Sequence, residues 1–364
     1  MTPSPSGMTP PPAVSMTTET APVLAQHRFD AAALARFMRA HIADFTPPLV
    51  VGQVRGGMSN PTFILTDGAS KRYVLRKKPP GKLLPSAHAV DREFRVIAAL
   101  WQTPVPVAKP YLLCQDPAVI GTDFYLMDFV EGRVLRNYEL PDMTPAQRRE
   151  IYEAMIDVLA TLHQIDFRAV GLADYGRVGG YMGRQLRRWI QQYEASKTDD
   201  IPVMEHLMAW LPAHLPDDTE TTIVHGDFRL ENMIFHPTEP RVLAVVDWEL
   251  STLGAPLSDL AYNCLPYYVP DEWRGDITAL DFASHGIPSE AEYVAHYCQR
   301  TGRRAIPAWP FYVVFSLFRL AAIVQGVYKR GLDGNASSPE AITMGEQCRQ
   351  LAEAAWALAE QQRR

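Results

Sequence analysis

Two short runs in the second half of the chain combine acidic and amide side chains at a spacing suited to phosphate chemistry. The first is residues 225–232 (HGDFRLEN), and the second is residues 246–249 (VDWE). Each run follows a short apolar segment, so Asp227 and Asn232 can point into one site while Asp247, on the next strand, faces them. Such oxygen ligands can hold Mg²⁺ through Asn232 and Asp247, which leaves Asp227 free to orient a hydroxyl nucleophile.

The order of these runs resembles the aminoglycoside phosphotransferase/choline kinase family of the protein-kinase-like fold. HGDFRLEN stands where protein kinases have HRDLKPEN, and VVDWE stands where they have the DFG strand. More narrowly, the chain is similar to the kinase-like domain that some proteins carry fused to an acyl-CoA dehydrogenase, because residues 253–261 (LGAPLSDLA) recur there with the other two runs. The resemblance covers about residues 29 to 350. It implies a bilobal α+β protein with a small antiparallel β N-lobe and a large, mostly α C-lobe.

The first half of the chain carries the pieces that the resemblance assigns to the nucleotide. A glycine-rich turn, residues 56–60 (GGMSN), lies between two strands, where backbone N–H groups can cradle phosphates. Arg76 stands in place of the usual strand lysine and can bind phosphate bidentately. The resemblance implies ATP and Mg²⁺ as cofactors, with nucleotide contacts at Gly57, Ser59, Asn60, Val74, Arg76, Glu93, Met127, Asp128 and Val130. Val74 and Arg76 share a strand face, Glu93 pairs with Arg76, and the last three residues form the hinge.

Other positions in the same runs have catalytic or supporting roles by resemblance. Arg229 lies two residues after Asp227, where a cation can neutralise charge on the transferred phosphoryl group. Asp227 and Arg229 are therefore the expected catalytic residues, and Asn232 and Asp247 the expected metal ligands. His225 is expected to brace the loop, and Asp259 to support the scaffold. Glu249 is either a helper for a second metal ion or an acid in the loop after the strand.

The hydrophobic pattern divides the chain into a β-rich and a helical part. Helical spacing from 29 to 41 is followed by short β-branched runs that predict an antiparallel meander. The predicted strands are 49–51, 61–65, 72–76, 111–115, 124–129, 222–224 and 242–246. The predicted helices are 29–41, 89–100, 146–164, 183–193, 203–211, 289–300, 309–329 and 339–362. We expect a disordered tail over 1–26, an N-lobe with the hinge over 27–131, and a C-lobe with the catalytic loop and substrate site over 132–364.

Three arginines in the helical half are candidates for binding the acceptor. Arg184 and Arg188 lie one turn apart on one helix face, and Arg319 interrupts the apolar run 309–328. A buried arginine needs an anionic partner, which is either a protein carboxylate such as that of Asp259 or an anionic group of the substrate. The second interpretation, together with the dehydrogenase-linked resemblance, predicts an anionic small-molecule acceptor: a hydroxyacyl-CoA or a hydroxy acid. The same resemblance implies a functional link to an acyl-CoA dehydrogenase.

Two other functions remain open. Aminoglycoside phosphorylation would need an acidic pocket for a cationic antibiotic, whereas the candidate pocket helices carry arginines. A non-catalytic, nucleotide-binding pseudokinase module usually lacks the catalytic or the metal-binding aspartate, whereas this chain keeps Asp227, Asn232 and Asp247. A phosphotransferase with an alcohol acceptor is therefore the preferred function.

Composition and sequence patterns indicate which partners and which cell compartment to expect. The formal net charge is −6 over 364 residues, which argues against a nucleic-acid partner because binding to phosphates needs a basic surface. The run 309–328 is long enough to span a bilayer, but a central Arg319 is costly in lipid, so we expect a buried helix and no membrane partner. The four cysteines form no metal or disulfide pattern, and the first residues lack a signal-peptide pattern. Both features predict a cytoplasmic protein.

Overall fold

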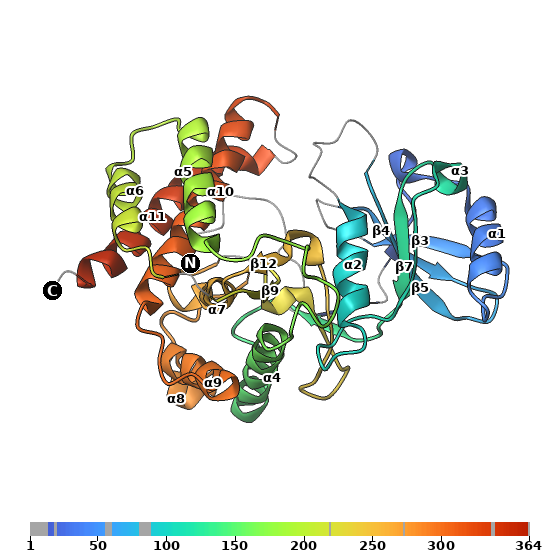
Figure 1. The fold of residues 1–364 in the computed structure, drawn as a ribbon, viewed down its shortest axis with the longest axis horizontal. Helices are drawn as coiled ribbons and strands as arrows, with labels where there is room; N and C mark the ends of the chain where they lie inside the picture. Colours follow the sequence, from blue (N-terminus) through green and yellow to red (C-terminus); the bar gives the residue numbers. More distant parts are fainter. Residues whose placement is uncertain are drawn as a thin grey trace.

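The structure is a computed structural model that describes residues 14–17, 20–54, 60–79, 89–217, 220–271, 274–335 and 339–362. It has two lobes: a small lobe built on an antiparallel sheet, and a larger lobe made mostly of helices (Figure 1). This bilobal α+β arrangement is the fold class that the sequence predicted. We propose that the lobes divide between Glu131 and Gly132.

The N-lobe sheet has six antiparallel strands in the order β2-β3-β4-β5-β7-β6. Their side chains alternate between two faces. On β5, Tyr73 and Leu75 are buried beside α1, whereas Val74 packs toward α2 on the other face. The prediction that Val74 and Arg76 share a face is thus confirmed. The elements of this lobe are β2 (Thr20–Ala21), α1 (Ala31–His41), β3 (Val50–Val54), β4 (Thr62–Thr66), β5 (Arg72–Lys77), α2 (Val90–Leu100), β6 (Pro110–Cys114), α3 (Pro117–Ile120) and β7 (Phe124–Asp128).

The C-lobe is organised around a long buried helix, α10 (Trp309–Leu332), which packs against α5, α7 and α11. This helix is long and apolar enough to cross a membrane, but 67% of its most apolar stretch is buried within the protein. It therefore has the character of a core helix, as the sequence indicated. The other helices of this lobe are α4 (Pro145–His163), α5 (Tyr181–Ser196), α6 (Pro202–Ala213), α7 (Pro256–Asn263), α8 (Phe282–His285), α9 (Glu290–Thr301) and α11 (Met344–Gln361).

Short strands of the C-lobe position the two polar runs. The loop 225–232 connects β9 (Thr222–Val224) to β10 (Met233–Phe235), and the run 246–249 follows β11 (Val242–Val245). β10 and β11 pair antiparallel, in a sheet with β1 (Val14–Met16) and β8 (Arg133–Leu135), while β9 pairs with β12 (Thr252–Gly254). The β10–β11 pairing brings the two polar runs side by side, although 13 residues, 233–245, lie between them in the chain.

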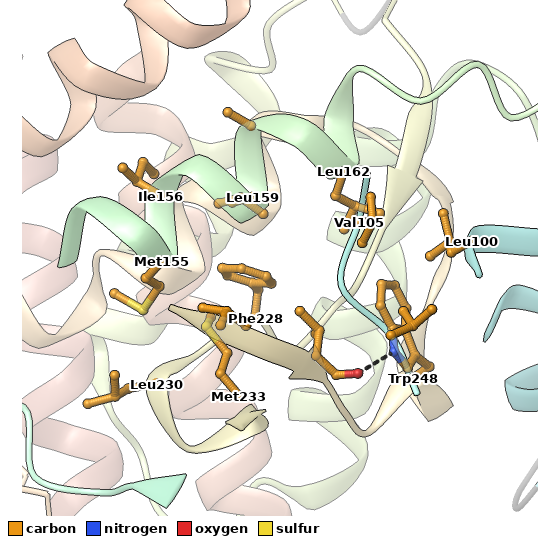
Figure 2. Close-up of a cluster of buried hydrophobic side chains, with 14 of the residues drawn as sticks. Leu100, Val105, Met155, Ile156, Leu159, Leu162, Phe228, Leu230, Met233 and Trp248 are labelled. Atoms are coloured by element: carbon orange, nitrogen blue, oxygen red, sulfur yellow. Dashed lines mark hydrogen bonds between the residues drawn. The ribbon is translucent and has the colours of Figure 1, made fainter. Parts of the chain in front are cut away.

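Apolar side chains of both runs pack into one hydrophobic core, which fixes the position of the backbone that carries the polar side chains (Figure 2). Phe228 and Trp248, one from each run, are almost fully buried, and Trp248 Nε1 donates a hydrogen bond to the Val245 carbonyl over 3.0 Å. Met155 and Leu159 of α4 lie in the same cluster. Each run thus alternates buried apolar anchors with the polar residues of the site.

Part of the segment 1–26, which the sequence predicts as a disordered tail, is described by the structure and adds a strand to a sheet in each lobe. β1 pairs with β8 of the C-lobe, and β2 pairs with β3 of the N-lobe. Between them, Thr17 donates from its hydroxyl to the Val130 carbonyl and from its amide to the Gly132 carbonyl, both over 3.0 Å. A Pro- and Thr-rich segment cannot form a core, but it can add backbone hydrogen bonds to existing sheet edges. Residues 1–13 lie outside the described part of the chain.

Candidate active site

The backbone of the catalytic loop is held by one buried carboxylate. Asp259, on α7, is 2% exposed and accepts hydrogen bonds from the amides of His225 and Gly226, over 2.5 and 2.8 Å. Burial raises the pKa of Asp259, but hydrogen bonding and charge from His163, together with the other donors, lower the pKa below its usual value. Asp259 therefore supports the loop as an anion, in agreement with the expected scaffold role.

His225 links the two polar runs. Its side chain is fully buried; Nε2 donates to the Val246 carbonyl over 3.0 Å, and Nδ1 accepts from the Asp227 amide over 3.2 Å. An imidazole with one donating and one accepting nitrogen is neutral. Both nitrogens contact backbone groups of the two runs, so His225 braces the site.

Asp227 lies at the centre of the loop. Asn232 Nδ2 donates to the Asp227 carboxylate over 2.9 Å and to its backbone carbonyl over 2.8 Å, and Arg229 Nε lies 3.2 Å from the same carboxylate oxygen. The Asp227 side chain is 14% exposed. A fixed, partly exposed carboxylate with a cation beside it can orient a hydroxyl group and accept its proton.

Arg229 is itself held by a chain of charges. Its Nη1 lies 2.8 Å from Glu231 Oε1, and Arg274 contacts both Glu231 oxygens at 2.9 and 3.0 Å. Burial raises the pKa of Glu231, but these two guanidiniums outweigh it, so the net shift is downward. The guanidinium of Arg229 is thus fixed between two carboxylates, close to Asp227.

Asn232 directly precedes β10 and Asp247 follows β11, so the two candidate metal ligands lie at the same end of this strand pair. The Val246 amide donates to the Asn232 carbonyl over 2.9 Å, and Asp247 has a left-handed backbone, with φ of 67°. Because Asn232 Nδ2 is used by Asp227, its amide oxygen is the atom suited to a cation. Among the described residues, no three His, Cys, Asp or Glu side chains group around a metal position. A carboxylate and an amide oxygen fit Mg²⁺ that takes its other ligands from phosphates and water.

Arg76 connects the two lobes. Its Nε lies 3.0 Å from Glu93 Oε2, on α2, and its Nη2 lies 3.2 Å from Asp247 Oδ1. Burial lowers the pKa of Arg76, but the negative charges around it reverse this shift and raise the pKa overall. Glu93 is 1% exposed, and burial raises its pKa despite the charge of Arg76. Tyr125 donates to Glu93 over 2.9 Å, and Asn60 donates to its other oxygen.

A tyrosine that the sequence did not suggest ties α2 to the C-lobe. Tyr175 is 1% exposed, and its hydroxyl contacts the Arg92 carbonyl at 3.2 Å and Ser251 Oγ at 2.7 Å. The Arg92 guanidinium stacks over the Tyr175 ring and donates to the Tyr175 carbonyl over 2.8 Å. Arg92 adjoins Glu93, and Ser251 lies a few residues after Asp247. Tyr175 therefore links the two segments that carry the ionic partners of Arg76, which are Glu93 and Asp247.

The remaining positions predicted to contact the nucleotide divide into two groups. Gly57 and Ser59 lie outside the described residues. Met127 is buried on β7 next to the hinge, while Asp128 donates from its amide to the Lys109 carbonyl over 2.8 Å and Val130 accepts from Thr17. Their contacts with adenine stay a prediction.

The three predicted acceptor arginines do not form one group in the described structure. Arg184 donates to the carbonyls of Arg177 and Gly179, at the start of its own helix. Arg319 instead donates to the Gly226 carbonyl over 2.9 Å, next to Asp227. The alternative pairing of Arg319 with Asp259 is wrong, because the Asp259 oxygens are taken by loop amides and His163.

The two-lobed fold and its polar cleft residues define a kinase-like phosphotransferase. The chain belongs to the phosphotransferase enzyme family, whose model matches residues 50–309. It is 45% identical over 351 residues to acyl-CoA dehydrogenase family member 11 of Rattus norvegicus; the match covers 93% of this chain but 44% of that protein. The chain thus spans less than half the length of this curated relative.

Solved structures share the fold. A Ralstonia eutropha protein, provisionally described as an aminoglycoside phosphotransferase, is 50% identical with a TM-score of 0.85, over 92% of this chain and 99% of that one. An amicoumacin kinase solved with AMP-PNP, Ca²⁺ and its antibiotic is 17% identical with a TM-score of 0.57, over 88% and 92% of the two chains. At that identity, the second likeness concerns the fold alone.

Proposed function

We propose that this phosphotransferase moves the γ-phosphoryl group of ATP, with Mg²⁺, to the hydroxyl of a hydroxyacyl-CoA or a hydroxy acid. The observation that carries the proposal is the arrangement of Arg76 and Asp247 across the lobes, 3.2 Å apart, beside the Asp227–Asn232 pair. This arrangement combines a phosphate-binding cation, oxygen ligands for a metal and a base for a hydroxyl. The position of an AMP-PNP-bound amicoumacin kinase among the structural neighbours supports ATP as the donor.

Each residue has a distinct task in this proposal. Asp227 orients the acceptor hydroxyl and takes its proton, and Arg229 balances charge near the reacting group. Arg76 binds donor phosphate oxygens, at the position where Glu93 holds it. Asn232 and Asp247 would hold Mg²⁺, which neutralises charge on the triphosphate when bound. Adenine is assigned to the hinge backbone at Asp128 and Val130, in front of Met127.

The acyl acceptor is supported by the names of relatives and by charge. Proteins 44–48% identical to this chain are named as acyl-CoA dehydrogenase family members, which suggests that the two activities act on related compounds. A cytoplasmic kinase acting with such a dehydrogenase is the setting that we propose. The aminoglycoside alternative draws support from the provisional description of the Ralstonia eutropha protein. A polycationic acceptor would, however, meet Arg319 beside Asp227.

The test is phosphoryl transfer from γ-labelled ATP to a panel of 3-hydroxyacyl-CoAs, 3-hydroxy acids and aminoglycosides. We expect transfer to one of the first two classes and almost none to aminoglycosides. Asp227→Asn serves as the inactive control, and Arg168→Ala, an exposed arginine outside the site, as the active control. Efficient transfer to aminoglycosides alone would overturn the acceptor class, and binding of ATP without transfer to any hydroxyl would favour the pseudokinase alternative.

A further inference from the structure

Two arginines from different helices contact the same indole ring in the C-lobe. The guanidinium carbons of Arg188, on α5, and Arg319, on α10, each lie 5.6 Å from the centre of the Trp189 ring. Arg319 also lies 5.0 Å from the centre of the Tyr262 ring, on α7. We call Arg188, Trp189 and Arg319 the indole–arginine cluster.

The cluster is rich in hydrogen-bond donors and poor in acceptors. Within the described residues, neither Arg188 nor Arg319 forms an ion pair with a carboxylate. Two of the cluster's donors, Trp189 Nε1 and Arg319 Nε, are buried and have no hydrogen-bond partner there. Indole N–H and guanidinium groups are donors only. Buried donors without partners are costly, so such a place is suited to an acceptor from outside the protein, a water molecule or a ligand atom.

The position of the cluster connects it to the reaction. Arg319 Nη2 donates to the Gly226 carbonyl over 2.9 Å, and Gly226 directly precedes Asp227. The same guanidinium lies over the Tyr262 ring, so Arg319 contacts both the catalytic loop and an aromatic side chain of α7. Burial and, to a smaller extent, the charge of Asp227 raise the pKa of Tyr262 to about 12. A ligand held by the cluster is adjacent to the group that receives the hydroxyl proton.

We propose that the indole–arginine cluster binds an anionic group of the acceptor, a carboxylate or a phosphate, and so selects the substrate. The proposal rests on the proposed function for its account of transfer, but the binding site itself does not depend on it. Arg184, which binds the backbone carbonyls of Arg177 and Gly179 just before its own helix, is not part of this site. Trp189, which the sequence did not single out, is part of this site.

The experiment measures binding separately from transfer. Dissociation constants are determined by calorimetry on the full chain with Mg²⁺ and AMP-PNP, using four hydroxylated probes. 3-Hydroxybutyrate is compared with the neutral 3-hydroxybutyramide, and 3-hydroxybutyryl-CoA with 3-hydroxybutyryl-pantetheine. The first pair isolates a carboxylate, whereas the second removes the phosphates of CoA together with its adenosine. A difference that is confined to one pair and lost in the arginine variants identifies the source of the anion.

The variants are Arg188→Ala, Trp189→Phe and Arg319→Met, with Arg168→Ala as matched control. Arg168 is also exposed and also stacks on the neighbouring aromatic residue, Phe167, at 4.4 Å. We expect each cluster variant to weaken the binding of the preferred anionic probe by about 10- to 100-fold, which corresponds to the loss of one charge-assisted hydrogen bond. The control and the neutral probes should change less than about twofold.

Separate outcomes decide the two proposals. Anion affinity that is equal in Arg188→Ala, Trp189→Phe and wild type would overturn the site, whatever Arg319→Met does to folding. Arginine-dependent binding without phosphorylation of any probe would support the site and overturn the proposed function. Phosphorylation of a hydroxyacyl probe with unchanged affinities in all variants would support the function and overturn the site.

Discussion

Replacing Glu93 by Gln tests whether the buried ion pair with Arg76 holds the nucleotide-binding side of the cleft. Glu93 accepts from Tyr125 and contacts Arg76 with one oxygen, and accepts from Asn60 with the other. A carboxamide has only one accepting oxygen. In either orientation, its NH₂ group faces a donor, and Arg76 keeps only Asp247 as an anionic partner.

The magnitude follows from burial. Hydrogen bonds to a charged group contribute about 1.5–3 kcal/mol, and breaking a buried pair by removing one charge costs about 3–5 kcal/mol. The carboxamide is less costly to bury than the carboxylate, which offsets part of this loss. We therefore expect Glu93→Gln to lower the free energy of unfolding by about 3 kcal/mol. Because Arg76 then pairs with Asp247 alone, we also expect KM for Mg-ATP to rise.

The assay is urea unfolding followed by tryptophan fluorescence, with the KM for ATP measured in parallel. Glu131→Gln is the matched control: Glu131 forms an ion pair of 2.5 Å with Arg72, but its side chain is 57% exposed. Exposed pairs contribute about 0–1 kcal/mol. Equal losses of stability in Glu93→Gln and Glu131→Gln would refute the argument from burial. A large loss of stability with unchanged KM for ATP would refute the link from Glu93 to the nucleotide.

Three further predictions concern the catalytic loop and two aspartates near it. Asp227→Asn should fold normally and bind Mg-ATP, but lose about 10²- to 10⁴-fold in turnover, the range of a positioned base; near-normal turnover in a steady-state assay would remove Asp227 from that role. Asp247→Ala should abolish the Mg²⁺-dependent part of the thermal shift given by ATP, and an intact shift would mean that other residues hold the ion. Because the folded-state pKa of Asp259 is lowered, its contribution to stability is present above the unfolded pKa of about 3.9 and lost as pH falls through the folded value. The difference in urea midpoint between wild type and Asp259→Asn should therefore be constant above about pH 5 and shrink at lower pH; a difference that grows on acidification would contradict this sign.

The predictable parts of the fold are those with a regular pattern. Period-two alternation located β5, with Val74 and Arg76 on one face, and helical periodicity located α4 and α10. The strands β8, β10 and β12 were not predicted. Each has three residues, too few to show a period. Each forms by backbone pairing with a strand distant in the chain, β8 with β1 and with β10, and β12 with β9, although β10 also pairs with the nearby β11.

The site was predictable where motifs carried it and not where single side chains did. Asp227, Asn232 and Asp247 stand in ordered runs, and the structure places them together. Tyr175 contacts Arg92, 83 residues away, and no local pattern marks such a residue. The sequence showed that Arg319 needed a partner but not which one, because Asp259 was already used by the loop amides.

The contacts of Tyr175 bear on how quickly the enzyme can exchange its nucleotide. Hydrogen bonds in both directions between Tyr175 and Arg92, and the bond from Arg95 to the Gly171 carbonyl, join α2 to the C-lobe. Ser251 holds the Tyr175 hydroxyl from within the C-lobe. Separating the lobes far enough to release ADP would break this set together. At about 1 kcal/mol for each bond, the three crossing bonds disfavour opening by about 10²-fold. We therefore expect lobe opening to slow the release of the nucleotide product in each catalytic cycle.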